Sequence, residues 1–95
     1  MSEPGPEWYV YMVRCRDGSL YTGVATDVNR RLSEHRQALT RAARYVKGRG
    51  PLTLVLRHKA GSRSLALRVE HEIKKLTRPQ KEALVEFQEL VEALL

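Results

Sequence analysis

Residues 8–24 of the chain read WYVYMVRCRDGSLYTGV. Aromatic and β-branched residues, which favour strands, dominate both ends of this segment. Arg16-Asp17-Gly18 in the middle contains residues that favour turns. The segment is therefore predicted to form a β-hairpin, with strands at residues 8–14 and 20–24.

The length of the turn determines where the tyrosines of the two strands point. A two-residue loop would place Tyr11 and Tyr21 on opposite faces, because side chains alternate along a strand. A three-residue loop, with Gly18 left-handed in a G1 bulge, pairs Cys15 with Ser19 and places both tyrosines on one face. We predict the three-residue loop.

One further strand and three helices are predicted beyond the hairpin. Asp27 is a good N-cap for a helix at about residues 28–39, and Thr77, Pro79 and Gln80 resemble a capping box. The expected order is β-β-α-β-α-α, with a strand at 53–57, a helix from 63 to about 76 and a last helix from 78 to 95. This order predicts an α+β fold, a small three-stranded antiparallel β-sheet flanked by three helices.

Apolar residues at helical spacing predict the buried side of each helix. The three predicted stripes are Val28, Leu32 and Leu39, then Leu65, Val69, Ile73 and Leu76, and finally Leu84, Phe87, Val91 and Leu94. The last stripe is expected to pack on the sheet, and the alternative is a protein-interaction or dimerisation surface.

Length and composition favour one folded domain. The chain has 95 residues, of which 42% are hydrophobic and 29% charged, so residues 1–95 are expected to form a single domain with a flexible tail at 1–6. A single cysteine allows neither an internal disulfide nor a zinc cluster, which makes the cytoplasm the default location. No apolar run has the roughly 18 residues of a spanning helix, and no signal peptide is recognisable, so no membrane association is expected.

Positive charge is concentrated in the middle of the chain. The net charge is +6, and residues 30–63 hold ten Lys and Arg against one acid, Glu34. Such a band suits a polyanion with closely spaced phosphates, and the alternative is an ordinary solvated basic surface. The residues expected to contact nucleic acid are Arg30, Arg41, Arg44, Tyr45, Lys47 and Arg49.

Two phenols, a guanidinium and an imidazole fall within 25 residues of one another. These are Tyr11, Tyr21, Arg31 and His35, and the last two lie four residues apart on one helix face. Together they could activate a water and hold a phosphodiester while it is cut. Glu70, further along the chain, is the candidate acidic metal ligand.

The order and spacing of these groups resemble the GIY-YIG endonuclease domain family, in particular its small stand-alone bacterial members. Tyr9-Val10-Tyr11 stands at the first family triplet and Tyr21-Thr22-Gly23 matches the second. Residues 25–35, 48–52 and 70–74 complete a resemblance that runs from about residue 8 to 81. Tyr9 replaces a glycine and Thr22 an isoleucine, which removes no reactive group, whereas the segment 37–43 lacks the glycines expected in the small stand-alone group.

The resemblance implies a metal-dependent DNA endonuclease that is structure-selective or non-specific. Tyr11 would act as general base or orient the attacking water, with nearby cations helping its phenol to ionise. Tyr21 would hydrogen-bond the water or the scissile phosphate, Arg31 would grip that phosphate, and His35 would assist there. Glu70 would hold one Mg²⁺ or Mn²⁺. DNA is favoured over RNA, a partner protein could add specificity, and the oligomeric state stays open.

Each functional assignment has a structural alternative. Both tyrosines could be ordinary strand aromatics, His35 a hydrogen-bonded histidine at the edge of the core, and Arg30 a solvated charge. Glu72 is the competing metal ligand, although it falls on a more polar helix face. For the whole chain, the alternative to a nuclease is a module that binds nucleic acid without hydrolysis.

Overall fold

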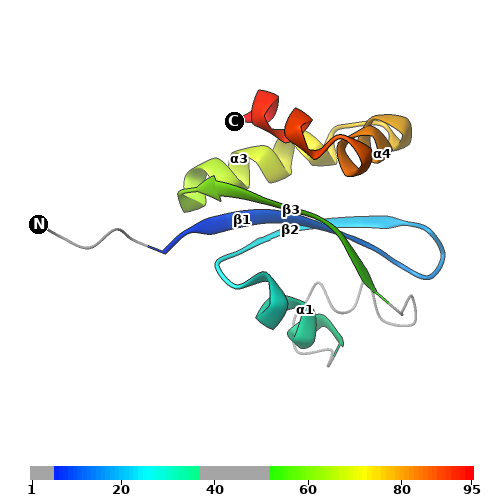
Figure 1. Ribbon diagram of the computed structural model, residues 1–95, viewed down its shortest axis with the longest axis horizontal. Helices are drawn as coiled ribbons and strands as arrows, with labels where there is room; N and C mark the ends of the chain where they lie inside the picture. Colours follow the sequence, from blue (N-terminus) through cyan, green and yellow to red (C-terminus); the bar gives the residue numbers. More distant parts are fainter. Residues whose placement is uncertain (1–5, 37–51) are drawn as a thin grey trace, which may run out of the picture.

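The computed structural model describes residues 6–36 and 52–95 as one antiparallel sheet with helices on both faces (Figure 1). Three strands are ordered β2-β1-β3, so β1 is central. Helix α1 covers one face, while α3, α4 and the 3₁₀ segment η1 cover the other. The predicted α+β class and element order are confirmed. The elements are β1 (Trp8–Arg14), β2 (Leu20–Ala25), α1 (Val28–Arg36), β3 (Thr53–Gly61), α3 (Arg63–Lys74), α4 (Arg78–Glu86) and η1 (Gln88–Leu94).

The β1–β2 hairpin has the predicted three-residue loop. The backbone N–H of Cys15 donates to the carbonyl oxygen of Ser19 at 2.9 Å, and Gly18 has a φ of 85°. That left-handed conformation costs little for glycine, which has no Cβ. Tyr11 and Tyr21 consequently lie on the same face of the sheet, the face covered by α1.

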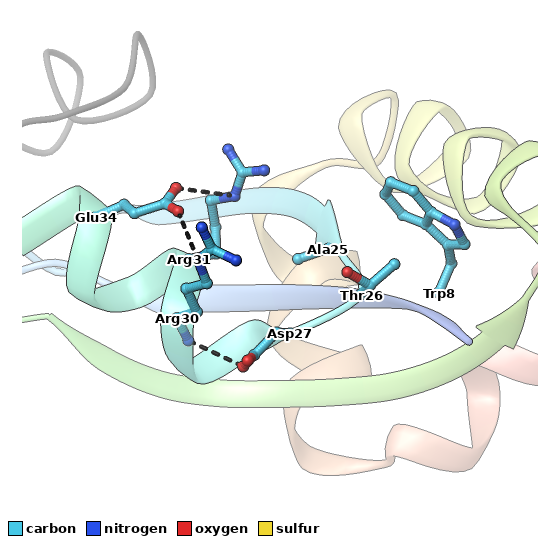
Figure 2. A pocket seen from close by; sticks show the side chains of 7 residues that line it. All are labelled: Trp8, Ala25, Thr26, Asp27, Arg30, Arg31 and Glu34. Atoms are coloured by element: carbon cyan, nitrogen blue, oxygen red, sulfur yellow. Dashed lines mark hydrogen bonds and ion pairs between the residues drawn. The ribbon is translucent and has the colours of Figure 1, made fainter. Parts of the chain in front are cut away.

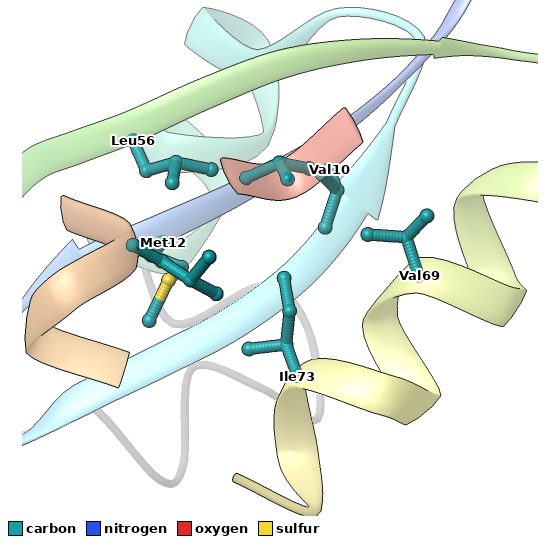
Figure 3. Packing of buried hydrophobic residues seen from close by; sticks show 7 residues of the cluster. Val10, Met12, Leu56, Val69 and Ile73 are labelled. Atoms are coloured by element: carbon teal, nitrogen blue, oxygen red, sulfur yellow. The ribbon is translucent and has the colours of Figure 1, made fainter. Parts of the chain in front are cut away.

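The central strand β1 is buried on both faces because helices cover both. Its almost continuous apolar sequence reflects this, since an alternating pattern is expected only where one face meets water. On the α3 side the buried cluster is Val10, Met12, Leu56, Val69, Ile73, Leu84 and Val91 (Figure 3). On the α1 side it is Tyr11, Val13, Ala25, Val28 and Leu32.

Helix α1 begins as predicted. The Oδ1 atom of Asp27 accepts the backbone N–H of Arg30 at 3.1 Å, which satisfies one of the otherwise unpaired donors of the first turn. Val28 and Leu32 are buried against the sheet. Leu39, the third member of the predicted stripe, lies outside the described residues, as do residues 1–5 of the predicted tail.

Helix α3 presents a slightly different stripe from the predicted one. The prediction that Leu65 belongs to the core was wrong, because this residue is 38% exposed. Ala66 is instead fully buried, together with Val69 and Ile73. The helix starts after Ser62, whose Oγ accepts the backbone N–H of Leu65. Leu65 is one residue, and therefore about 100° of helix rotation, away from the face that meets the sheet.

Strand β3 is longer than predicted and is irregular at its end. It extends to Gly61, because its polar residues pair through their backbone with the start of β1. Trp8 pairs with Gly61 and Tyr9 with Lys59, which leaves Ala60 as an extra residue between the two pairs. Such bulges change the direction of neighbouring side chains, and this one lies beside Trp8.

The last predicted helix is interrupted. The capping box at its start is confirmed, but the α-helix ends at Glu86, and Phe87 has a φ of −122° and a ψ of 78°. The chain continues as 3₁₀ segment η1, from which the Gln88 side chain donates to the carbonyl oxygen of Val55 on edge strand β3. The prediction that Phe87 belongs to the core was wrong, because this residue is 48% exposed. Leu84 and Val91, from the same predicted stripe, do pack on the sheet. None of the described helices is long and apolar enough to cross a membrane.

Helix α4 is bonded to the hairpin turn through charged groups. Arg14 donates two hydrogen bonds to the Glu82 carboxylate, at 2.6 and 2.8 Å. Arg78 also pairs with Glu82, and its Nη2 donates to the carbonyl oxygen of Gly18 at 2.6 Å. The hydrogen bonds from Arg14 and Arg78 hold the pKa of Glu82 at about 2, well below its ordinary value. The paired arginines thus fix the turn against α4.

Replacing this carboxylate should change the acid stability of the fold. A carboxyl whose folded pKa is lowered stabilises the fold above its ordinary pKa of 4.5, and that contribution is lost as the pH falls toward about 2. Glu82→Gln should therefore lower the free energy of unfolding at pH 7, and its difference from the wild type should shrink between pH 4.5 and 2. Urea unfolding across this range measures the difference. Glu86→Gln, exposed on the same helix, is the matched control, and an equal effect of both variants would contradict the assignment.

Candidate functional site

All five predicted catalytic side chains line one cavity of about 260 Å³. They come from four elements: Tyr11 from β1, Tyr21 from β2, Arg31 and His35 from α1, and Glu70 from α3. The remaining lining residues are Trp8, Gly23, Val24 and Arg63. The structure thus brings the predicted groups together, although their roles stay predictions.

The cavity forms at β2 because β2 is an edge strand. Helices α1 and α3 lie on opposite faces of the sheet, and both contact β2. A side chain from each helix can therefore line one cavity beyond the edge, as those of Arg31 and Glu70 do. A central strand would have separated the two groups by the thickness of the sheet.

Gly23 on this edge strand gives room to the Tyr11 side chain. A Cβ atom at Gly23 would lie 2.5 Å from the Tyr11 hydroxyl oxygen and 2.6 Å from the ring carbon that bears it. Both distances are shorter than a non-bonded contact allows, so the ring of Tyr11 occupies the space of the missing side chain. Since Tyr11 pairs with Gly23 across the strands, its hydroxyl reaches the cavity over the bare backbone.

Tyr11 and His35 form a buried hydrogen-bonded pair. The Tyr11 Oη and His35 Nε2 atoms are 2.8 Å apart, and the two residues are 1% and 3% exposed. Burial lowers the pKa of His35 below its ordinary 6.5, with Arg31 acting in the same direction, so the imidazole is mainly neutral at pH 7. His35 is therefore a buried, hydrogen-bonded histidine, and its catalytic role stays a prediction.

The phenol of Tyr11 stays protonated in this environment. Burial raises its pKa well above the ordinary value of 10.0, and Tyr21 adds to the rise. Arg31 lowers the pKa, as expected of a nearby cation, but its effect is smaller than that of burial. The expectation that neighbouring cations would make Tyr11 ionise readily is not supported by these residues.

Tyr21 also contacts His35. Its ring meets the imidazole edge-to-face, with centroids 5.7 Å apart and planes at 83°. Burial and the Glu70 carboxylate both raise the pKa of Tyr21, so it too carries a proton near neutral pH. The imidazole has a second phenol neighbour, because the Tyr11 ring centroid lies 6.2 Å away on a plane tilted by 42°.

Arg31 and Arg30 share one carboxylate but differ in position. Their Nε atoms lie 3.7 and 3.5 Å from the oxygens of Glu34 (Figure 2). The Arg31 side chain is 41% exposed and lines the cavity, whereas that of Arg30 is 79% exposed and does not. This matches the sequence interpretation, in which only Arg31 faces the reactive groups.

Glu70 offers one carboxylate to the cavity. Its side chain is 19% exposed, and Oε2 pairs with Lys74 Nζ at 3.5 Å on the same helix. Residues 6–36 and 52–95 contain no cluster of three or more His, Cys, Asp or Glu suited to a metal ion. A single carboxylate still suits a hard divalent cation such as Mg²⁺, which usually keeps several waters and takes further oxygens from phosphate. Glu72, the competing candidate, pairs with Lys75 and does not line the cavity.

Two lining residues were missed by sequence reasoning. Trp8 was counted only as a strand residue, and Arg63 only as part of the basic band. The Arg63 guanidinium carbon lies 5.8 Å from the centroid of the Trp8 ring. The predicted nucleic-acid contacts Arg41, Arg44, Tyr45, Lys47 and Arg49 all fall outside the described residues.

A side chain at Gly23 should disturb the site and the fold together. Gly23→Ala forces the Tyr11 ring to move within a packed core, which typically costs about 1–3 kcal/mol. The cost should largely disappear in a Tyr11→Ala background, where the ring is absent. Urea unfolding of the two single variants and the double variant measures this coupling. Equal costs of Gly23→Ala in both backgrounds would show that the close approach is not the cause.

Comparisons with known proteins find a family model and relatives that cover most of the chain. Residues 7–83 match the family model described as the GIY-YIG catalytic domain, a span that includes the hairpin, α1, β3 and α3. The chain is similar to the UPF0213 protein YhbQ of Salmonella arizonae, with 49% identity over 93% of this chain and 86% of the relative. It is also 49% identical to a UPF0213 protein of Cronobacter sakazakii, over 93% of this chain and 90% of that protein.

Two solution NMR structures share the fold. One is the UPF0213 protein BH0048 from Bacillus halodurans, 44% identical, with a TM-score of 0.56 over 85% of this chain and 84% of that one. The other is the protein EF2693 from E. faecalis, 37% identical, with a TM-score of 0.63 over 94% of this chain and 93% of that one. These two proteins therefore share the arrangement of strands and helices of this chain.

Proposed function

The chain belongs to the GIY-YIG family of catalytic domains, and from this premise we propose that it is a divalent-metal-dependent endonuclease that hydrolyses phosphodiester bonds in DNA. The observation that carries the proposal is the convergence of Tyr11, Tyr21, Arg31, His35 and Glu70 on one cavity. Residues 1–95 would act as a single domain.

The Tyr11–His35 pair is the proposed means of activating water. The Tyr11 hydroxyl donates to Nε2 of the neutral imidazole, in the tautomer that carries its proton on Nδ1. An attacking water gives its proton to the Tyr11 oxygen as the phenol proton passes to His35. A free tyrosinate, which burial disfavours, is then never required. The raised pKa of Tyr11 keeps the phenol protonated and the lowered pKa of His35 keeps the imidazole neutral, which are the two protonation states from which this transfer starts.

Arg31 and Tyr21 would hold the scissile phosphate. The planar guanidinium of Arg31 can donate two parallel hydrogen bonds to phosphate oxygens and stabilise the negative charge of the transition state. The protonated Tyr21 hydroxyl can donate a further one. The phosphate must displace Glu34 as partner of Arg31, and this exchange is feasible because the 3.7 Å pair is partly exposed.

Glu70 would hold the divalent ion. When bound, the ion would act as a Lewis acid that stabilises charge on the phosphate and on the leaving oxygen. Because a single carboxylate binds Mg²⁺ weakly, we expect the substrate phosphate to complete the site. Either Mg²⁺ or Mn²⁺ would serve, since both accept carboxylate, phosphate and water oxygens.

Cleavage should require these groups and the metal. The test panel is labelled branched, single-stranded and duplex DNA, with RNA in parallel. The wild type should cut DNA with Mg²⁺ or Mn²⁺ and should leave it intact with EDTA. Glu70→Ala, Tyr11→Phe and Arg31→Ala should each lower the cleavage rate by about a hundredfold or more, because each removes a group that acts in the transition state. Glu72→Ala is the matched control and should cleave normally.

Binding measured by fluorescence anisotropy distinguishes a nuclease from a module that binds nucleic acid without hydrolysis. The Tyr11→Phe variant should still bind DNA, since it keeps the charged groups. If the wild type binds every substrate but cuts none, the domain is a binding module and the enzymatic proposal is wrong.

The pH profile of cleavage should report the protonation of His35. Because burial lowers the pKa of His35 below 6.5, the imidazole loses its capacity to accept a proton only as the pH falls below that value. The wild-type rate should decline on the acid side, whereas Tyr11 adds no ionisation below pH 10 because its pKa is raised. His35→Gln should lower the rate about a hundredfold and abolish the acid-side decline. An unchanged decline in this variant would assign it to another group.

A further inference from the structure

A second cavity adjoins the first and shares two residues with it. It is drawn in Figure 2, and its volume is also about 260 Å³. Its lining comes from Trp8, the end of β2 and the first turns of α1: Trp8, Ala25, Thr26, Asp27, Arg30, Arg31 and Glu34. Trp8 and Arg31 line both cavities, so the two form neighbouring compartments around the Trp8 ring.

Trp8 is poorly explained as a core residue. It belongs to neither of the main buried clusters, although tryptophan has the largest apolar side chain. It pairs with Gly61 at the bulged end of β3. Gly61 has a φ of 102°, and a Cβ placed there would meet nothing within 4 Å. The fold therefore holds a large aromatic ring at an open corner of the sheet.

The charges of the two cavities differ. The first contains two arginines, Arg31 and Arg63, against the single carboxylate of Glu70, and so has a positive excess that suits a phosphate. The second contains Arg30 and Arg31 against two carboxylates. Both of its acids are already engaged, Asp27 with the backbone of Arg30 and Glu34 with both arginines. A balanced, partly aromatic compartment suits an uncharged group better than a second phosphate.

We propose that Trp8 stacks against an unpaired nucleobase of the nucleotide next to the scissile phosphate. The Arg63 guanidinium lies over the Trp8 ring and lines the first cavity but not the second. The base therefore enters the second cavity while the scissile phosphate stays with Arg31. This inference rests on the proposed nuclease function.

The substrate class follows from this stacking. In a regular duplex both faces of each base are covered by its neighbours, so a base can stack on a tryptophan only after it has left the stack. The preferred substrates are therefore DNA strands with an unpaired nucleotide at the cut, such as single strands, flaps and branches. A volume of about 260 Å³ is below the roughly 300 Å³ at which pockets for drug-sized ligands begin, which fits one base and not a longer segment.

Trp8 is the only tryptophan of the chain, so its own fluorescence reports the contact. The test is a titration of the full-length protein with single-stranded oligonucleotides in EDTA, where no cleavage is expected. The cut position is first mapped with metal, and then single abasic sites are placed along the strand. The intact strand should quench Trp8 fluorescence. An abasic site at one nucleotide beside the cut should remove most of the quenching and weaken binding roughly tenfold, as stacked bases do in other single-strand binders.

Two variants connect the effect to the indole. Trp8→Ala should weaken binding of the intact strand roughly tenfold, measured by anisotropy, and the abasic site should then cost nothing further. Trp8→Phe, which keeps an aromatic face, should bind nearly as well as the wild type. The abasic scan alters only the DNA, so it tests the proposal even if Trp8→Ala does not fold.

The outcomes separate this proposal from the nuclease proposal. Binding without quenching, or equal binding of all abasic strands, overturns the stacking role even if the wild type cleaves DNA. Quenching that disappears with one abasic position supports stacking even if no cleavage is found, in which case the scan itself locates the base. Tighter binding of a blunt duplex than of the single strand also contradicts the stacking role of Trp8.

Discussion

The close approach of Tyr11 to Gly23 is the contact on which the cavity depends. The tyrosine hydroxyl oxygen lies only 2.5 Å from where a Cβ at position 23 would be, so the absence of that atom lets a central-strand side chain reach past the edge strand. The same placement lets Tyr11 bond His35 from α1. Without this approach the phenol would have been an ordinary member of the buried cluster, with no route to a solvent-filled space.

Burial determines the protonation states of the hydrogen-bonded Tyr11 and His35 side chains. An exposed tyrosine and histidine would exchange protons with water independently, near pH 10 and 6.5. Here burial shifts the two pKa values in opposite directions, which keeps both groups neutral over the ordinary pH range. In the proposed relay the phenol proton passes to His35 while a proton from water replaces it, so the positive charge appears on the imidazole and no tyrosinate forms in the core. The sequence supports only the presence of these groups, because the size and sign of the shifts depend on tertiary packing.

The sequence predicts what local chemistry determines. The hairpin loop, the Asp27 N-cap and the capping box at Thr77 involve groups within four residues of one another, and all three were correct. Features that depend on distant partners were missed. Leu65 was placed in the core by its spacing alone, and the break at Phe87 follows from how η1 meets the sheet. Trp8 was not predicted as a cavity residue, because its position depends on an irregular strand pairing that a single sequence does not reveal.

The hairpin register also limits how such a chain can vary in evolution. Because successive side chains of β1 belong to opposite faces, one inserted residue between Tyr11 and Gly23 would exchange the occupants of the two faces from that point onward. Two inserted residues would keep the faces but move Tyr21 by about 7 Å along the strand. Point substitutions between these positions leave the register intact. Divergence in this segment should therefore proceed by replacement, while length changes collect in parts of the chain that no catalytic side chain depends on.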